Sequence, residues 1–309
     1  MSSIEMMPPE GKKPLSIEAP KPIEQIREEL MGSMGELAES VNHDVQSENY
    51  INKECAINSD YYFSSESDRE EYKNSLIKKE KYFISRTKGI EEKKVTDEQH
   101  NEWLKKRAET KNKKSDLLEM MNTLLLHKGL GKDYIVVRTC EGDDYSGVDN
   151  IIVHKPSGTV ICAFDDFHSG FGSDSEEKKM NYIKTSSKNG GVDLNHGFTI
   201  IEGKLVTKAL HNIPIFYIAF NVIEFEKALQ CLDTKNIHSL SLKEEVFYNK
   251  MIQAFEDQLP IIEQQMLLGK NRQKTRILKE NLEKFKKLLP SMKRSTNVKE
   301  QEGSYKAAS

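Results

Sequence analysis

The chain has 309 residues and a formal net charge of −3, with 37% hydrophobic and 31% charged residues. This composition is too polar for one evenly buried globule, so the apolar residues must be concentrated in part of the chain. No apolar run approaches the roughly 20 residues that a membrane-spanning helix needs, and we therefore expect no membrane association.

Segment 1–22 carries five prolines and little that could be buried, which is typical of a disordered tail. It also lacks the apolar stretch of a secretory signal, so we expect a cytoplasmic protein. Segment 23–114 predicts a charged helical extension from its apolar spacing and acidic helix starts. The helices expected there are 23–45, 67–86 from the capping-box pattern Ser67-Asp68-Arg69-Glu70, and one starting at Thr96.

Segment 115–221 holds the apolar runs and predicts an α/β core. Its order is α-β-β-β-α-β with a mixed central sheet, flanked by the N-terminal and C-terminal helical extensions. The last strand is apolar on both faces, which favours a place inside the sheet. The expected elements are helix 115–128 closed by Gly129 and Gly131, strands 134–139, 148–154 and 159–165, helix 173–189, a hairpin at 198–206 and strand 215–220.

Segment 222–290 predicts a C-terminal helical region, followed by a polar, disordered tail at 291–309. Pro260 and Pro290 are expected to end helices because proline removes a backbone donor. The predicted helices are 223–232, 241–259 and 273–289.

Basic residues are concentrated in two segments, which indicate the kind of partner that the protein binds. Between Lys270 and Arg294 ten basic residues face only Glu280 and Glu283, and Lys105–Lys114 carries six. Such patches predict a nucleic-acid partner. The first segment is also amphipathic, so a helix whose charged side is simply solvated is the competing interpretation.

The four cysteines concern metal binding and the compartment. They form no CxxC pair, which argues for a reducing compartment and against a structural zinc site. They are Cys55, Cys140, Cys162 and Cys231.

A short loop between two predicted strands sets two aspartates against each other. If Pro156-Ser157-Gly158 is a three-residue loop, with Gly158 in the left-handed conformation, Asp149 faces Asp165 across the hairpin. Their Cβ atoms are then about 4.5–5.5 Å apart. A four-residue loop would instead place Asp149 opposite Phe164 and split the pair between the two faces.

Two carboxylates placed in this way raise one pKa or recruit a cation. A divalent metal held by carboxylate oxygens and water, here Mg²⁺, suits such a pair. The competing interpretation is structural: Asp149 ends a turn and Asp165-Asp166 caps a loop, as aspartates at strand ends commonly do.

This order of elements, with Asp149 at the start of the second strand and Asp165 at the end of the third, resembles the PD-(D/E)xK nuclease superfamily. The resemblance covers 115–221, about a third of the chain. It implies that Asp149 is the first metal-binding Asp and Asp165 the acid of the (D/E)xK element. The chain departs from the pattern because the position two after Asp165 is Phe167 rather than Lys.

Some members of the superfamily supply the lysine from the following helix, where Lys178, Lys179 and Lys184 lie. The resemblance therefore implies that Lys178, one turn into that helix, complements the negative charge developing on the substrate. It further implies that Glu119 on the preceding helix is an additional ligand or general base.

Two functions follow as hypotheses. One is a Mg²⁺-dependent phosphodiester hydrolase, or a catalytically degenerate relative, acting on nucleic acid. The other is a non-enzymatic interaction protein whose helical arms bind a protein partner or self-associate. Convergence of Asp149, Asp165 and a lysine in a solvent-reachable cleft would favour the enzyme. Either aspartate capped by backbone N–H groups, or paired to a surface lysine, would favour the scaffold.

Overall fold

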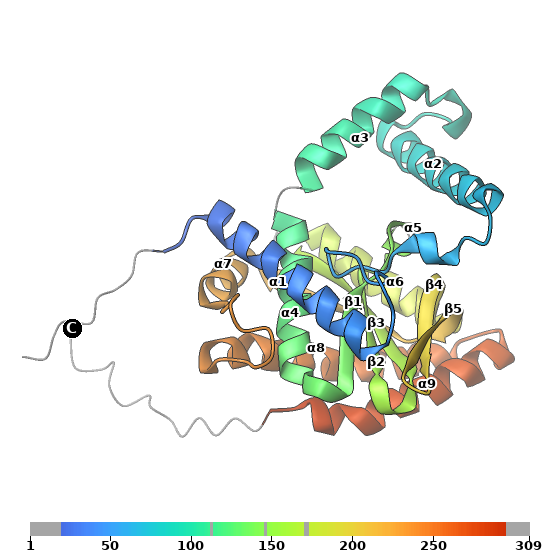
Figure 1. Ribbon diagram of the computed structural model, residues 1–309. Coiled ribbons are helices and arrows are strands. Elements are labelled where there is room, and N and C mark those ends of the chain that lie inside the picture. Colours follow the sequence, from blue (N-terminus) through green and yellow to red (C-terminus); the bar gives the residue numbers. More distant parts are fainter. Residues whose placement is uncertain (1–19, 112–113, 145–146, 170–172, 295–309) are drawn as a thin grey trace, which may run out of the picture.

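A four-stranded mixed sheet forms the centre of the computed structural model, which describes residues 20–111, 114–144, 147–169 and 173–294 (Figure 1). The strand order is β1-β2-β3-β6, antiparallel between β1, β2 and β3 and parallel between β3 and β6. A mixed α/β protein with helices at both ends is therefore confirmed. The strands are β1 Tyr134–Arg138, β2 Asn150–His154, β3 Thr159–Ser169 and β6 Ile215–Asn221, and a separate hairpin consists of β4 Val192–Ile201 and β5 Lys204–Ile213.

Helices cover both faces of this sheet. Asp166 of β3 meets Asn122 of α4, whereas Asp165 meets Lys179 of α6, so the two helices lie on opposite faces. α1 packs on α4, and α2 and α3 form an arm that projects from the body (Figure 1). The helices are α1 Ile23–Asp44, α2 Glu66–Lys88, α3 Asp97–Lys111, α4 Lys114–Leu130, α5 Glu141–Asp144, α6 Ser173–Lys188, α7 Val222–Cys231, α8 Leu242–Leu267 and α9 Arg272–Met292.

One hydrophobic core joins the segments that the sequence separates. Leu30 of α1, Leu124 of α4, Phe164 of β3, Phe255 of α8 and Phe285 of α9 are all fully buried in it. No helix among the described residues is both long and apolar enough to cross a bilayer. The tails predicted at 1–22 and 291–309 lie largely outside the described residues.

Strand β6 lies at an edge of the sheet, so the prediction that it is an interior strand was wrong. Its two apolar faces are covered by α6, α7 and α8 rather than by a further strand. The side chain of Gln258 on α8 accepts from Tyr217 N at 2.9 Å and donates to Tyr217 O at 2.8 Å. This amide satisfies backbone groups that an edge strand otherwise exposes.

Several predicted helix boundaries also require correction. Helices α8 and α9 run through Pro260 and Pro290, because buried apolar residues on both sides of each proline hold the helix on the core. The N-cap of α2 is Ser65, two residues before the predicted Ser67, because the Ser65 hydroxyl accepts from Asp68 N. Gly129 lies inside α4 and does not close it.

The β2–β3 turn differs from the predicted one, yet the register beyond it is as predicted. His154 pairs with Thr159, so the loop has four residues, Lys155 to Gly158. Gly158 has the expected positive φ of 65°. A bulge at Ile161 adds one residue to β3 and restores the pairing of Asn150 with Phe164. The bulge cancels the shift that the longer loop would cause.

Candidate functional site

Asp149 and Asp165 lie against each other at one end of the sheet. Asp149 precedes β2, and its backbone N–H donates to Phe164 O at 3.1 Å, which fixes Asp149 beside β3. Their carboxyl groups are within hydrogen-bonding reach of each other. Both residues are buried, with 9% and 4% of their surface exposed.

The lysine at this pair is Lys179, not the predicted Lys178. Lys179 Nζ forms an ion pair with Asp165 Oδ2, whereas Lys178 is exposed. The reason is helical phase: Lys179 lies four residues before the buried Ile183 and thus shares its face, while Lys178 is turned by about 100°.

Asp166 points to the opposite face of the sheet, as strand alternation requires. Its two carboxylate oxygens accept from Asn122 Nδ2 and Asn150 Nδ2, both at 2.8 Å. Its backbone N–H donates to Asp149 Oδ2 at 2.7 Å. Neither Asn122 nor Asn150 was part of the predicted site. The feature that could have identified them in the sequence is a polar residue next to the apolar residues of α4 and of β2.

Glu119 lies near the pair but is engaged elsewhere. Arg138 Nη2 donates to Glu119 Oε2 and, at 3.0 Å, to Asp116 Oδ1. Arg138 leaves β1 beside the start of β2, and only 8% of its side chain is exposed. The ion pair orients Glu119 towards the sheet end, where its charge contributes to raising the pKa of Asp149.

A polar cavity of about 240 Å³ opens beside Asp149. Glu119, Arg138 and Asp149 form one wall, and the loop 52–59 forms another. This loop is fixed to the sheet edge because Ile57 N donates to Arg138 O at 3.0 Å and Arg138 N to Cys55 O at 2.8 Å. Asp149 can therefore be reached from a cavity that is lined by polar groups, whereas Asp165 does not line it.

The charges at this site do not balance. Five carboxylates gather against only two cations among the described residues: Asp116, Glu119, Asp149, Asp165 and Asp166 against Arg138 and Lys179. Arg138 compensates the two acids of α4, and Lys179 compensates Asp165. Among the side chains that the structure describes, no cation forms a direct ion pair with Asp149 or Asp166, and a purely structural network would more simply be neutral.

Burial shifts the pKa values of the charged groups at this site. Burial, and then the charges of Asp165 and Glu119, raise the pKa of Asp149 well above its usual value. Burial likewise raises the pKa of Asp166, although the Asn122 amide opposes the shift. Burial alone would lower the pKa of Lys179, but the Asp165 carboxylate outweighs it and raises that pKa.

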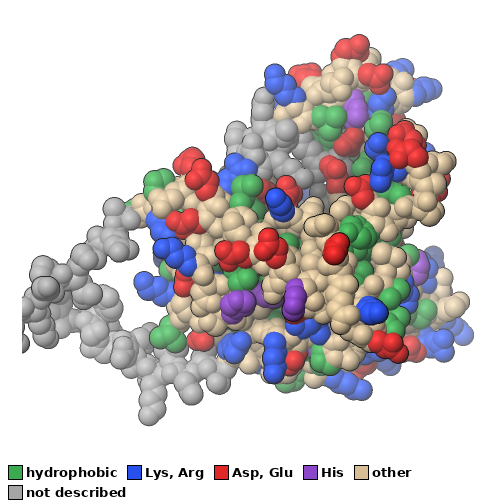
Figure 2. All heavy atoms as spheres, viewed as in Figure 1, with side chains coloured by type: hydrophobic (Ala, Val, Ile, Leu, Met, Phe, Trp, Pro, Cys, Tyr) green, Lys and Arg blue, Asp and Glu red, His purple; other side chains and the backbone are tan. Residues whose placement is uncertain are grey.

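The two basic segments lie apart from the carboxylates or outside the described side chains. Lys284 of α9 lines the same cavity as Thr159, which is six residues from Asp165, a span of about 20 Å along the strand. Figure 2 shows Lys and Arg along the lower edge of this face, where α9 lies. Part of its charge is compensated by ion pairs, at Lys274, Arg276, Lys286 and Lys293. Of the segment Lys105–Lys114, the side chains of 107–113 lie outside the described residues.

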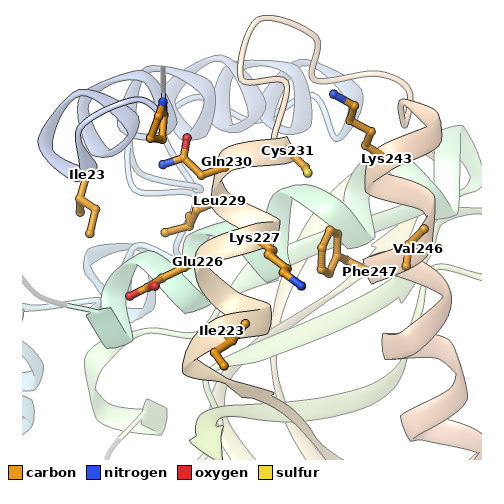
Figure 3. A pocket seen from close by; sticks show the side chains of 11 residues that line it. Ile23, Ile223, Glu226, Lys227, Leu229, Gln230, Cys231, Lys243, Val246 and Phe247 are labelled. Atoms are coloured by element: carbon orange, nitrogen blue, oxygen red, sulfur yellow. The ribbon is translucent and has the colours of Figure 1, made fainter. Parts of the chain in front are cut away.

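A second cavity, of about 760 Å³, is an apolar groove between α7 and α8 (Figure 3). Ile223 and Val246 on its rim are 67% and 65% exposed, and Lys227 and Phe247 face each other across it. It is lined by α1, α7 and α8 and shares no residue with the carboxylate site. No group in it is arranged for chemistry.

Comparison of the chain with known protein families, with curated proteins and with solved structures gave no match. The function must therefore be argued from the geometry and charge of the site.

Proposed function

We propose that the chain is a Mg²⁺-dependent phosphodiester hydrolase of the PD-(D/E)xK type that acts on nucleic acid. The observation that carries the proposal is the buried Asp149–Asp165 pair: Asp149 lines a polar cavity, and among the described side chains Lys179 is the one lysine paired with Asp165. The order α4-β1-β2-β3-α6-β6 supports the proposal, with the short helix α5 inserted between β1 and β2, and β4 and β5 inserted before the last strand.

The donor set suits a hard divalent cation. Asp149 and Asp165 present carboxylate oxygens, the ligands that Mg²⁺ prefers, and Mg²⁺ keeps several waters, for which the polar cavity has space. The pair carries more negative charge than Lys179 alone can compensate. Mg²⁺, when bound, polarises a phosphoryl oxygen and lowers the pKa of its water.

The residues of the chain supply position and charge. Asp149 is held by the Asp166 N–H, and Asp165 lies within β3 where this strand pairs with β6, so both carboxylates are fixed before substrate binds. Lys179 Nζ lies beside Asp165, where it would stabilise negative charge developing on the phosphate. Arg138 holds Glu119 at the cleft wall, and Glu119 is thus a positioning group rather than the general base.

The test is cleavage of labelled oligonucleotides, single- and double-stranded, DNA and RNA, by the full-length protein in Mg²⁺, in Mn²⁺ and in EDTA. We expect cleavage that requires the metal and falls at least about 100-fold in Asp149→Asn and Asp165→Asn. Lys178→Ala is the matched control, because this exposed neighbour of Lys179 should leave the rate unchanged.

Cleavage that persists undiminished in Asp165→Asn would refute the assignment of the site. If the wild-type protein neither cleaves any of the four substrates nor gains thermal stability with Mg²⁺ or Mn²⁺, the hydrolase proposal fails. The interaction protein is then the better description, with the carboxylates as a structural network.

A further inference from the structure

A second cluster of metal-ligating groups lies where three separate segments meet, and one of its members, Cys140, lines the same polar cavity as Asp149. Cys140 follows β1, Asp143 lies in α5, and His196 lies in β4. One ligand atom from each residue lies within 4.8 Å of the other two. Cys140 and Asp143 are buried, and the side chain of His196 is 11% exposed.

From this cluster we infer a structural Zn²⁺ site formed by Cys140 Sγ, an Asp143 carboxylate oxygen and His196 Nδ1. The site is independent of the proposed hydrolase function, and its ligands differ in kind from those expected for Mg²⁺. A thiolate and an imidazole select a borderline-soft ion such as Zn²⁺, which binds mixed S, N and O ligands in tetrahedral geometry.

The distances fit the edges of a tetrahedron. With Zn–S near 2.3 Å and Zn–N and Zn–O near 2.1 Å, tetrahedral angles place N and O about 3.4 Å apart and S and O about 3.6 Å apart. His196 Nδ1 lies 3.4 Å from Asp143 Oδ2, and Cys140 Sγ lies 3.7 Å from the same oxygen. Two edges thus match those of a zinc tetrahedron, and the third, between the histidine nitrogen and the cysteine sulfur, is at most 4.8 Å.

Backbone N–H groups orient the Asp143 carboxylate within the cluster. Asp143 Oδ1 accepts from Asn195 N at 3.0 Å and Oδ2 from His196 N at 2.9 Å, so the carboxylate is oriented while keeping lone pairs for a metal. By contrast, His196 Nδ1 is buried and makes no well-formed hydrogen bond with any described residue. A buried nitrogen in this condition is expected to have a further partner.

Aromatic residues of the N-terminal region close the site. The rings of Tyr62 and Tyr72 lie edge-on to the His196 imidazole, each with centroids 4.9 Å away. The Tyr72 hydroxyl lies 3.8 Å from Cys140 Sγ, so it is the oxygen donor next to the cluster. Gly142 admits this hydroxyl, because a Cβ there would lie 2.8 Å from it.

Charge supports zinc as well. A thiolate, a carboxylate and a neutral imidazole compensate one divalent cation, so the buried site would be neutral when loaded. The ion would join the β1–β2 connection to the β4–β5 hairpin, with Tyr72 tying α2 to both. The histidine of this site comes from a strand distant in sequence, so the site has no local motif such as CxxC. For this reason it could not be predicted from the sequence.

The test uses the full-length protein, freed of metal and kept reduced, and titrated with Co²⁺ as a spectroscopic stand-in for Zn²⁺. We expect one equivalent to give cobalt–thiolate charge-transfer and tetrahedral d–d bands, which one equivalent of Zn²⁺ abolishes. Cys140→Ser should remove the charge-transfer band, and His196→Asn should weaken binding at least about 100-fold. Tyr72→Phe should weaken binding about 10-fold.

Two matched controls use residues outside the cluster. Cys231→Ser removes another thiol, and His211→Asn disrupts an exposed His–Asp pair with the same 3.4 Å separation, at Asp193. Both should bind Co²⁺ like the wild type. A wild-type spectrum without the charge-transfer band overturns the inference, even if the cluster variants fail to fold. Unchanged Co²⁺ affinity in folded Cys140→Ser overturns it too.

Discussion

The Asp149 carboxylate accepts a hydrogen bond of 2.7 Å from the backbone N–H of Asp166, the residue after the acid that it faces. This bond ties the start of β2 to the end of β3 and holds Asp149 against Asp165. One backbone donor stabilises the Asp149 charge only in part, because burial still raises the pKa of this carboxyl. The buried negative charge of Asp149 therefore destabilises the folded protein. Binding of a cation, protonation or a neutral substitution would remove this destabilisation.

Asp149→Asn should stabilise the metal-free protein at neutral pH. The amide keeps the shape of the carboxylate and can accept from Asp166 N, but it removes an uncompensated charge. We expect the melting temperature in EDTA to rise by about 2–4 °C, which corresponds to about 1 kcal/mol. The same variant should lose any stabilisation by Mg²⁺. Asp133→Asn, at an exposed position, is the control, and a lower melting temperature for Asp149→Asn in EDTA would contradict the prediction.

The Asp149 carboxyl should make the folded protein less stable as the pH rises, which is opposite to the usual effect of a carboxyl group. The pKa of Asp149 is higher in the folded protein than its usual 3.8, so the folded state binds this proton more readily than the unfolded state. Its contribution is therefore present below the usual pKa and is lost as the pH rises through the folded pKa.

Chemical denaturation between pH 4 and 8 in EDTA measures this contribution. The difference in unfolding free energy between wild type and Asp149→Asn should shift in favour of the wild type as the pH falls, by up to about 1.4 kcal/mol per pH unit. Using the difference cancels carboxylates whose pKa is lowered, such as Asp143. A difference that does not vary with pH would show that the Asp149 pKa is not raised.

Two adjacent lysines offer a matched comparison. Lys179→Met leaves Asp165 buried without its cation and should cost about 1–3 kcal/mol of stability, together with about 100-fold or more in any cleavage rate. Lys178→Met should change stability by less than about 0.5 kcal/mol. Lys179→Arg keeps the charge and should recover stability more than rate. Equal effects of the two Met variants on denaturation would contradict the assignment.

The lysine shows where sequence reasoning was incomplete. Three lysines on one helix were visible, but choosing among them required the helical phase that the buried Ile183 sets. Lys179 shares that face and Lys178 does not. The choice was therefore available in principle from the spacing, had the helix been phased on its apolar residue.

The hairpin shows a limit of another kind. The predicted three-residue turn was wrong, but the bulge at Ile161 compensates for the longer loop as far as the pair Asn150–Phe164, and the carboxyl groups of Asp149 and Asp165 still meet. Apolar periodicity fixes which residues face the core, and thus the register far from the turn. A bulge depends on local turn geometry, which the pattern of residues does not reveal. The meeting of Cys140 with His196 depends on the placement of β4, which no local pattern encodes.

A fully buried ion pair outside the site gives a prediction about stability. Lys128 Nζ donates at 2.6 Å to both Glu244 Oε1 and Asp233 O, and neither charged side chain is exposed. Lys128→Met should cost about 3–5 kcal/mol, because it leaves Glu244 buried and unpaired. Adding Glu244→Gln, which can still accept from Ser241 N, should recover part of this loss in a double-mutant cycle. Lys73→Met, which breaks an exposed pair with Glu70, should cost less than about 1 kcal/mol.

Gly129 marks the closest approach of α4 to α8. A Cβ at this position would lie 2.0 Å from the ring of Tyr248, whose hydroxyl donates to Met292 O and so cannot move away freely. We expect Gly129→Ala to destabilise the protein by about 1–3 kcal/mol, in spite of the better helix propensity of alanine. Gly32→Ala in α1 is the matched control: no atom lies within 4 Å of its added Cβ, so it should stabilise by about 0.5–1 kcal/mol. Denaturant midpoints of the two variants should therefore move in opposite directions. A shift in the same direction would mean that α8 can separate from α4 without loss of core packing.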